Sequence, residues 1–376
     1  MKILITGGAG FIGCKLSEFL IKEGHEVTIL DNFNPQIHGK SVESLKDRLT
    51  TNGIEIIVGD VRSKDNVASA LIGKQSVVHL ASETGTGQSM HQVFNYAETN
   101  VLGTSNLVEQ IIGNKANIEC FVLSSTRAVY GEGKYVCEAH GVQLPETRIS
   151  SMMKAGVFDP LCQFCEKPMK PIATDENTPT KPTSVYGITK LCQEQIALKT
   201  LQTIGVRSVA LRLQNVFGPG QSLKNPYTGI LSIFSNQMIE DRPIYIFEDG
   251  QESRDFIYID DVVSVMNLAL LGKNTVENVF NVGSGSMTTV MEIVEKLKGI
   301  YKSESKVIVT GEYRAGDIRH NFADTKRTQE ILGFTPIHSI DEGLRKFGEW
   351  VLTQAVSENN YEESLNELRK LGLLQG

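Results

Sequence analysis

The chain has 376 residues, of which 40% are hydrophobic and 22% are charged, so it can form two globular domains, or one large domain with an appendage, with ordinary cores. Its net charge of -7 and the lack of a basic run argue against nucleic acid as a partner. No apolar run reaches the ~20 residues that a bilayer span needs, and the first residues lack a signal-peptide layout. We therefore expect a cytoplasmic protein without a membrane partner, whose cysteines are thiols or metal ligands rather than disulfides.

A glycine-rich motif follows the first apolar segment. Residues 2–6 (KILIT) are expected to form a strand, and Gly7, Gly10 and Gly13 then give a G-x-x-G-x-x-G pattern before an amphipathic helix over residues 11–22. Such glycines permit a tight turn and let a pyrophosphate approach the backbone at the positive end of the helix. The pattern predicts a dinucleotide-binding site.

An aspartate, Asp31, directly follows the second expected strand, which covers residues 25–30. The Asp31 carboxylate can accept hydrogen bonds from both hydroxyls of an adenosine ribose and would repel a 2′-phosphate, which favours NAD over NADP. The alternative is a simple glycine turn followed by an exposed aspartate. The strand–glycine–helix context makes the cofactor interpretation the stronger one.

The alternation of strands and helices continues along the first half of the chain. Further strands are expected over residues 54–58, 76–80 and 120–123, and a long helix over residues 89–112. Short apolar strands that alternate with helices predict an α/β fold, a doubly wound (Rossmann) parallel sheet.

Three polar residues in this half have open roles. Asp60 either caps the next helix or reaches the adenine edge of the cofactor, and the sequence favours neither. His79 lies in an apolar run and is expected in the core. Asn100 lies inside the long expected helix, where it could face the cofactor phosphates.

A tyrosine and a lysine four residues apart are the candidate catalytic pair. On a helix, Tyr186 and Lys190 would lie on one face, one turn apart. A lysine ammonium stabilises a phenolate and so lowers the pKa of the tyrosine towards neutrality. Such a tyrosine can take a proton from a sugar hydroxyl or return one. Thr126 ends the fifth expected strand at the ligand-binding edge of the sheet, where its hydroxyl can share a hydrogen bond with Tyr186 and the sugar.

With these residues assembled, the chain resembles the extended short-chain dehydrogenase/reductase family, and within it the nucleotide-sugar epimerases and dehydratases. The matching motifs are GGAGFIG, SSTRAVYG, SVYGITK, LRLQNVFGPG and RDFIYIDDV. The resemblance implies NAD as cofactor, a nucleotide sugar as substrate, and Thr126, Tyr186 and Lys190 as the catalytic triad. Relatives commonly dimerise through two helices of the NAD domain, so a homodimer is expected.

The resemblance also implies a domain division and further site residues. The expected segments are an NAD-binding domain over 1–130, an insertion over 131–183, a return to the NAD domain with the catalytic helix over 184–213, and mainly a substrate-binding lobe over 214–376. The remaining expected cofactor contacts are Phe11, Ile12, Asn32, Val61, Leu80 and Ala81, together with Tyr186 and Lys190. The expected substrate contacts are Glu83, Thr126, Arg127, Asn215, Asn225, Arg254 and Arg314. Arginine forks match phosphate oxygens, so Arg254 and Arg314 are candidate diphosphate clamps.

One departure from the family pattern narrows the reaction. The 4,6-dehydratases carry an Asp-Glu pair directly after the threonine of this strand end, whereas Arg127 and Ala128 stand there in this chain. Without an acid–base pair, dehydration is disfavoured, and Asp31 disfavours the NADP-using reductases. Epimerisation at the sugar C4 position remains. The alternatives are epimerisation of another UDP-, dTDP- or GDP-hexose, a 4-reductase or dehydrogenase, and, more distantly, a non-catalytic NAD-binding scaffold.

The insertion carries two close pairs of metal-ligand residues. Cys137 and His140 form C-x2-H, and Cys162 and Cys165 form C-x2-C. Two such pairs match a tetrahedral structural zinc site, which would order a loop that is poor in apolar residues. The alternative is a set of surface thiols and an exposed histidine. This insertion and its flanks resemble bacterial dTDP-L-rhamnose 4-epimerases, which interconvert dTDP-L-rhamnose and dTDP-6-deoxy-L-talose.

The C-terminal half continues the alternation. We expect strands over 206–213 and 279–282, a helix opened by residues 225–227, and helices over 262–271, 290–300 and 340–353. A terminal helix is expected from residue 358 onwards, packed on the body of the protein or on a partner subunit.

Overall fold

The computed structural model describes residues 1–39, 42–113, 117–223, 229–272, 278–354 and 361–376. Within these residues, one seven-stranded sheet with the order β14-β9-β5-β4-β1-β2-β3 forms the centre of the molecule, and all of its neighbouring strands are parallel. Its strands are β1 (Lys2–Thr6), β2 (Glu26–Asp31), β3 (Glu55–Val58), β4 (Ser76–His79), β5 (Cys120–Thr126), β9 (Arg207–Leu213) and β14 (Val279–Val282). The order reverses between β1 and β4, which is where doubly wound sheets bind ligands.

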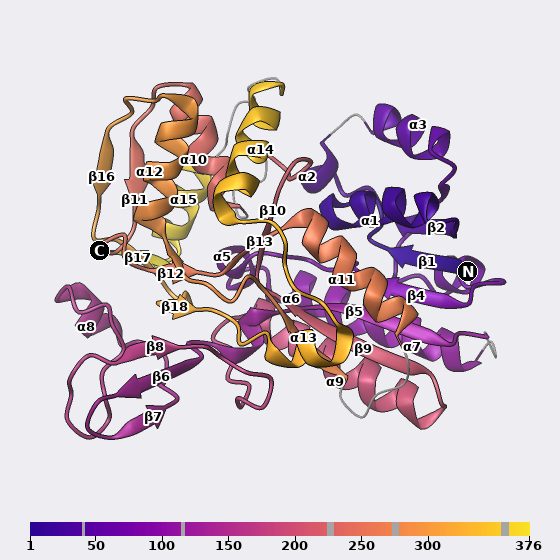
Figure 1. Cartoon of the computed structure of the whole chain (residues 1–376), viewed down its shortest axis with the longest axis horizontal. Coiled ribbons are helices and arrows are strands. Elements are labelled where there is room, and N and C mark those ends of the chain that lie inside the picture. Colours follow the sequence, from indigo (N-terminus) through magenta and orange to yellow (C-terminus); the bar gives the residue numbers. More distant parts are fainter. Residues whose placement is uncertain (40–41, 114–116, 224–228, 273–277, 355–360) are drawn as a thin grey trace.

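Helices cover both faces of this sheet (Figure 1). Near the sheet lie α1 (Phe11–Lys22), α2 (Pro35–His38), α3 (Glu43–Thr51), α4 (Lys64–Ala70), α5 (Thr86–Ser89), α6 (Val93–Tyr96), a π-helical segment (Ala97–Leu102), α7 (Gly103–Gly113), a 3-10 turn (Arg127–Tyr130), α9 (Val185–Thr203), α11 (Ile259–Leu271) and α13 (Lys326–Leu332). One apolar cluster joins α1 and α11 to one face, and a second joins α4, α7 and α9 to the other. The expected doubly wound α/β fold is therefore confirmed.

Most expected elements have nearly the expected bounds, and two differ. The helix expected over 89–112 is continuous only from Val93 and contains the π-helical turn Ala97–Leu102. The helix that we expected residues 225–227 to open begins at Ile230 as α10, and residues 225–227 lie outside the described part.

A second group of elements forms a lobe beside the carboxyl ends of the sheet strands. It contains β10 (Asn215–Phe217), α10 (Ile230–Ile239), β11 (Ile244–Ile246), β12 (Ser253–Arg254), β13 (Phe256–Tyr258), β15 (Thr288–Thr289), α12 (Val290–Tyr301), β16 (Val307–Val309), β17 (Tyr313–Arg314), β18 (His320–Asn321), α14 (Ile340–Leu352), α15 (Tyr361–Lys370) and β19 (Leu374–Gln375). Its apolar residues join the α1–α11 cluster, so the lobe shares a core with the sheet. Two elements from the C-terminal half, β14 and α11, belong to the sheet layer itself.

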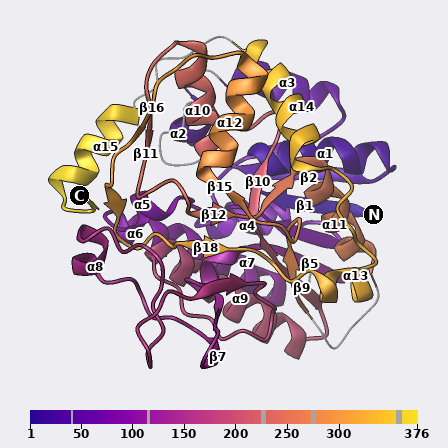
Figure 2. The same cartoon turned by 60° about the vertical axis from the view of Figure 1, so that its left-hand side comes forward.

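The insertion forms a small unit that projects below the lobe in Figures 1 and 2. It contains β6 (Lys134–Cys137), β7 (Gly141–Gln143), α8 (Ser150–Lys154) and β8 (Lys170–Ile172), and its three strands form an antiparallel sheet. Its own apolar core is small: Tyr135 and Met169 pack with two of the cysteines.

Buried ion pairs join the insertion to the lobe. The Arg148 guanidinium lies 3.0 Å from Glu132 and 2.8 Å from Glu248, and all three side chains are at most 5% exposed. Arg319, which is 2% exposed, contacts Glu248 and also Asp159 of the insertion. Arg319 thus has a structural role that accounts for its burial.

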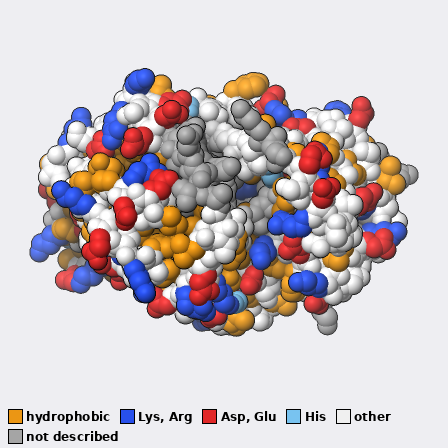
Figure 3. All heavy atoms as spheres, turned by 90° about the horizontal axis from the view of Figure 1, so that it is seen from above, with side chains coloured by type: hydrophobic (Ala, Val, Ile, Leu, Met, Phe, Trp, Pro, Cys, Tyr) orange, Lys and Arg blue, Asp and Glu red, His pale blue; other side chains and the backbone are white. Residues whose placement is uncertain are grey.

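On the face in Figure 3, acidic and basic side chains are interspersed. Among the described helices, none has both the length and the apolar character to cross a bilayer. All six cysteines are described, and each is a free thiol.

Candidate active site

One cavity of about 590 Å³ lies between the sheet and the lobe. It is lined by most of the residues that the sequence predicts. The expected cofactor residues among them are Gly7, Gly10, Phe11, Ile12, Gly13, Asp31, Asn32, Asp60, Val61, Leu80 and Ala81, and the expected catalytic and substrate residues are Glu83, Thr126, Arg127, Tyr186, Lys190, Asn215, Arg254 and Arg314. Asn225 lies outside the described residues. The cavity thus joins segments from nearly the whole length of the chain.

The glycine loop forms the turn between β1 and α1. Gly7 has a φ of +69°, and a Cβ on it would lie 2.7 Å from the backbone nitrogen of Ala81, so only glycine fits. The loop brings the N-terminus of α1 to the cavity, where free N–H groups favour phosphate. At the end of β2, the Asp31 carboxylate accepts hydrogen bonds from the backbone N–H of Ala9 and Phe33. These residues fit a dinucleotide such as NAD.

Asp60 lines the cavity and is not a helix cap. Ser63 caps α4 by accepting a hydrogen bond from the backbone of Asn66, so the capping alternative for Asp60 is wrong. The Asp60 carboxylate instead accepts hydrogen bonds from Arg62 and from the Asn32 amide. Burial alone would raise its pKa, but these hydrogen bonds lower the pKa of Asp60 to about 2. The carboxylate is therefore ionised and fixed at the edge of the cavity.

Asn100 supports the cavity wall instead of facing the cavity. It is fully buried, and its amide accepts from the backbone N–H of Glu83 and donates to the backbone carbonyl of Glu83 and to Thr189. The direct phosphate contact that the sequence suggested is thus replaced by a link between the loop after β4 and helix α9. His79 lies in the core as expected, where it is fully buried and contacts Thr6 and Thr104. This burial lowers the pKa of His79 to about 3.

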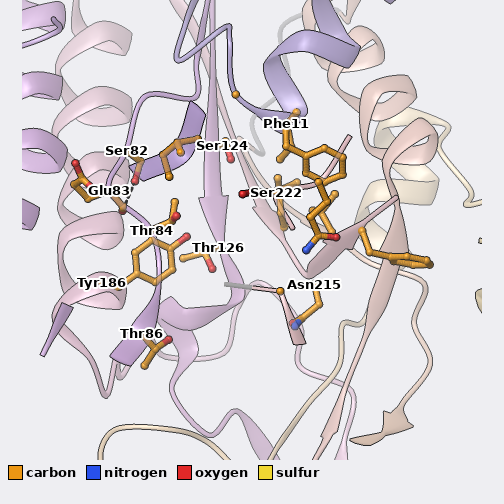
Figure 4. Close-up of a pocket in the computed structure, with 18 of the residues that line it drawn as sticks. Phe11, Ser82, Glu83, Thr84, Thr86, Ser124, Thr126, Tyr186, Asn215 and Ser222 are labelled. Carbon is orange, nitrogen blue, oxygen red and sulfur yellow. Dashed lines mark hydrogen bonds between the residues drawn. The ribbon is translucent and has the colours of Figure 1, made fainter. Parts of the chain in front are cut away.

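The structure brings the expected triad together. Thr126 ends β5, Tyr186 lies in the first turn of α9, and both side chains line the cavity together with Lys190. Figure 4 shows both hydroxyls pointing into the cavity. Gly187 allows this approach, because a Cβ there would lie 2.6 Å from the carbonyl oxygen of Ala128. Ser184 fixes the start of α9 by accepting a hydrogen bond from the backbone of Gly187 at 3.1 Å.

The protonation states of the pair differ from the expectation. Burial raises the pKa of the Tyr186 phenol, and the nearby Thr126 hydroxyl and the charge of Arg127 only partly oppose this shift. Burial also lowers the pKa of Lys190 to about 7, against the charge of Glu194. Desolvation therefore outweighs the pairing that the four-residue spacing predicts. Burial therefore favours the uncharged form of both groups, and the phenol needs nearby positive charge to ionise.

Arginines gather at the end of the cavity beside the triad. The Arg127 Nε donates to the Asn215 side-chain oxygen at 2.9 Å, which fixes its guanidinium at the cavity wall. Arg254 contacts Asp317 at 3.0 Å and donates to three backbone carbonyls. Arg314 stacks over Phe247, with its guanidinium carbon 4.6 Å from the ring centroid. These three guanidinium groups suit an anionic ligand such as a diphosphate, although Glu248, Glu252 and Asp317 also line the cavity.

Some residues that line the cavity were not predicted from the sequence. The cavity is also lined by Thr84, Thr86, Gln214, Ser222, Phe234, Tyr245, Phe247, Glu252 and Tyr361. Thr84 and Thr86 lie in the segment ETGTGQSM, which follows the fourth strand of the sequence, while the aromatic residues of the lobe carry no local motif. They reach the cavity only through long-range packing.

The four candidate metal ligands also meet, away from this cavity. The side-chain ligand atoms of Cys137, His140, Cys162 and Cys165 all lie within 4.8 Å of one another. The Cys162 sulfur accepts hydrogen bonds from the Gln143 amide and the Phe164 backbone. Donors to sulfur stabilise a thiolate, which is the form that binds metal. These residues therefore fit a tetrahedral zinc site.

Comparison with known proteins agrees with this geometry. A family model described as the NAD dependent epimerase/dehydratase family matches residues 162–283, and one described as GDP-mannose 4,6 dehydratase matches residues 4–141. A dTDP-L-rhamnose 4-epimerase from Burkholderia thailandensis is 36% identical over 95% of this chain and 97% of its own length.

Solved structures show the same fold. A UDP-glucose 4-epimerase from Thermotoga maritima with UDP-glucose has a TM-score of 0.75 and 29% identity, covering 94% of this chain and 99% of its own. A UDP-glucuronic acid 4-epimerase from Bacillus cereus in complex with UDP-glucuronic acid and NAD has a TM-score of 0.75 and 26% identity, with the same two coverages. The chain therefore belongs to the NAD-dependent epimerase/dehydratase family, as an extended short-chain dehydrogenase/reductase of the nucleotide-sugar epimerase type.

Proposed function

We propose that this enzyme is a NAD-dependent 4-epimerase that interconverts dTDP-L-rhamnose and dTDP-6-deoxy-L-talose. The observation that carries the reaction type is that Thr126, Tyr186 and Lys190 line one cavity, with Arg127 and Ala128 in the places where the dehydratases have an acid pair. The similarity to the Burkholderia thailandensis enzyme over nearly the whole chain supports the choice of sugar.

In the proposed reaction, Tyr186 transfers the proton and Thr126 positions the sugar. When bound, NAD accepts a hydride from C4 and later returns it, so no external redox partner is needed. Tyr186 removes the proton of the C4 hydroxyl as the C–H bond breaks, and a 4-keto sugar forms. The Thr126 hydroxyl holds the sugar oxygen beside the phenol. After the keto sugar has rotated within the cavity, Tyr186 returns the proton to its C4 oxygen.

Positive charge assists the phenol in this step. Burial raises the pKa of Tyr186, so the phenolate needs the Arg127 guanidinium and a protonated Lys190. Arg254 and Arg314 would hold the diphosphate of the substrate, which leaves the hexose at the triad.

A product assay tests the function. Purified protein incubated with dTDP-L-rhamnose should form the talo epimer up to an equilibrium mixture, without net change in nicotinamide absorbance. A 4-reductase or dehydrogenase would instead change that absorbance in proportion to product. Conversion of a UDP- or GDP-hexose alone would keep the epimerase and reject the dTDP sugar.

We further infer that the Cys137, His140, Cys162 and Cys165 cluster holds a structural zinc. A tetrahedral zinc places its sulfur and nitrogen ligands about 3.3–3.8 Å apart, and the separations here include 3.4, 3.6 and 3.7 Å. Four protein ligands leave no open position, so the metal would have no catalytic role. Metal analysis of protein purified without chelator should give about one zinc per chain; metal-free protein with a folded insertion would reject the site.

We also infer a homodimer through the helices beside α9. Phe94 of α6 is 76% exposed and Leu102 of the π-helical segment is 60% exposed, and Ile188 of the neighbouring α9 is 48% exposed. Large exposed apolar side chains on adjacent helices indicate an interface. Leu102→Glu should give a monomer in sedimentation analysis, whereas Ile337→Glu, at an exposed site outside these helices, should not. Equal masses for the wild type and Leu102→Glu would reject this interface.

A further inference from the structure

The last described segment of the chain packs against the lobe beside the cavity. Strand β19 pairs with β17, so that Leu374 lies opposite Arg314 in the register. The Arg369 guanidinium makes a two-pronged ion pair with Glu312, at 2.8 and 2.9 Å. Tyr361, Leu365, Leu368 and Leu374 are buried in the main apolar cluster. This segment, residues 361–376, is therefore a fixed part of the lobe, and Figure 2 shows α15 at its outer edge.

Helix α15 also reaches the sheet domain. A methyl group placed on Gly87, in α5, would lie 3.7 Å from the Leu368 Cδ1 atom. The Glu367 carboxylate lies 3.8 Å from the His91 ring. Gly87 lines the cavity as well. The helix thus connects the two walls of the cavity at the end away from the glycine loop.

Tyr361, the first residue of α15, is the part of this segment that lines the cavity. It is only 6% exposed, and its phenol lies near the Arg314 guanidinium, whose positive charge acts to lower the pKa of the phenol. Arg314 also stacks on Phe247, while its buried Nε has no hydrogen-bond partner. Phe234 of α10 and Tyr245 of β11 also line the cavity, and Tyr245 adjoins Tyr361 in a small neighbouring hollow.

The chemistry of this group is specific. Aromatic rings offer flat faces to a planar base, and a guanidinium offers donors to a phosphate or a base carbonyl. Burial raises the pKa of Tyr361, so the phenol stays protonated and can still donate its own O–H. The orphaned Arg314 Nε marks a buried donor without a partner within the protein.

We propose that helix α15 completes the nucleotide subsite, and that Tyr361, beside Arg314, contacts the base and adjacent phosphate of the nucleoside diphosphate moiety. This inference rests on the proposed function, because it takes a nucleotide sugar as the ligand. It assigns to residues 361–376 a direct part in substrate binding, in addition to their packing. The triad and the NAD end of the cavity do not depend on it.

Calorimetric titration with dTDP, and separately with UDP, tests this subsite on the full-length protein. Tyr361→Ala should weaken dTDP binding about 10-fold or more, from the loss of aromatic contact. Tyr361→Phe should retain most of the affinity of the ring and lose only the part due to the hydroxyl. The NAD affinity of both variants should equal that of the wild type.

Leu365→Ala is the matched control, because Leu365 is buried on the same helix but does not line the cavity. It should lower the melting temperature at least as much as Tyr361→Ala and leave the dTDP affinity nearly unchanged. An equal loss of dTDP affinity in both variants, an unchanged affinity in Tyr361→Ala, or a wild type that binds neither nucleotide would overturn the inference. A wild type that binds dTDP but epimerises no sugar would contradict the proposed function and leave the Tyr361 result standing.

Discussion

The central sheet and the insertion over residues 131–183 are stabilised in different ways. The sheet is covered on both faces by large apolar clusters, so burial of apolar surface dominates its free energy of unfolding. The insertion has a small apolar core and depends on a Cys/His cluster and on buried ion pairs to the lobe. We infer that the sheet region stays folded after a local substitution, whereas the insertion unfolds when one of its strong contacts is removed.

The largest expected effect is a loss of turnover after a substitution at the catalytic site of the sheet region. Tyr186→Phe removes the proton-transfer group and should lower turnover by about 10²–10⁴-fold. Because the ring remains, melting temperature and NAD affinity should change little.

Tyr301→Phe is the control for this variant, since the Tyr301 hydroxyl binds Ser235 in the lobe and does not line the cavity. It should keep wild-type turnover. Steady-state kinetics would remove Tyr186 from the mechanism if the two variants were equally active.

The next effect concerns the insertion alone. Cys162→Ser should prevent zinc binding and unfold the insertion, because metal binding supplies folding free energy that the small core cannot. Limited proteolysis followed by mass spectrometry should then show new cleavage within 131–183, with the sheet region intact.

Cys192→Ser serves as the control, since Cys192 lies on α9 outside the cluster. It should retain zinc and the wild-type cleavage pattern. Resistance of the Cys162→Ser insertion to protease would mean that its ion pairs suffice without metal.

A smaller, purely thermodynamic effect tests the ion pairs. Arg148→Met leaves Glu132 buried without its ion-pair partner and leaves Glu248 with Arg319 alone, which should cost about 3–5 kcal/mol of unfolding free energy. The exposed pair of Arg345 and Glu349 should contribute about 0.3–0.5 kcal/mol, so Arg345→Met should have little effect. Denaturant titration measures both, and equal losses would contradict the proposed role of the buried network.

The smallest expected effect is a pH dependence of stability that arises at the catalytic helix. Burial lowers the pKa of Lys190 to about 7 in the folded protein, from 10.5 as its ordinary value. Between these values the unfolded chain binds more protons, so the contribution of Lys190 to stability rises with pH across that window.

The difference in unfolding free energy between the wild type and Lys190→Met, both free of NAD, should therefore shift in favour of the wild type by at most about 1.4 kcal/mol per pH unit. Titrations at pH 7 and pH 8 measure this shift. A difference that stays constant between them would show that Lys190 titrates at its ordinary value.

Local motifs predicted the sheet side of the site well. The first strand and helix have the expected bounds, and Asp31, Thr126, Tyr186 and Lys190 line the cavity. These features depend on short-range patterns: an apolar run, a glycine turn and a four-residue helical spacing. The Cys and His pairs were also predictable, because each pair is local and ligand chemistry demands that the pairs meet.

Features that depend on long-range packing were not predictable. Asn100 bonds to Glu83 and Thr189, and Arg148 to Glu248, across separations that no local pattern encodes. The pKa of Tyr186 depends on how deeply the phenol is buried, which the spacing to Lys190 cannot reveal. Tyr361 reaches the cavity only because the end of the chain packs back onto β17.

Proton NMR of the enzyme with dTDP-L-rhamnose in deuterated water tests the central claim of C4 epimerisation by hydride transfer most directly. The account predicts dTDP-6-deoxy-L-talose that retains protons at C4 and C5, because the hydride leaves and returns without exchange with solvent. Deuterium at C3 or C5 of the product would indicate enolisation and contradict the mechanism, and the absence of the talo epimer even with added NAD would contradict the proposed substrate.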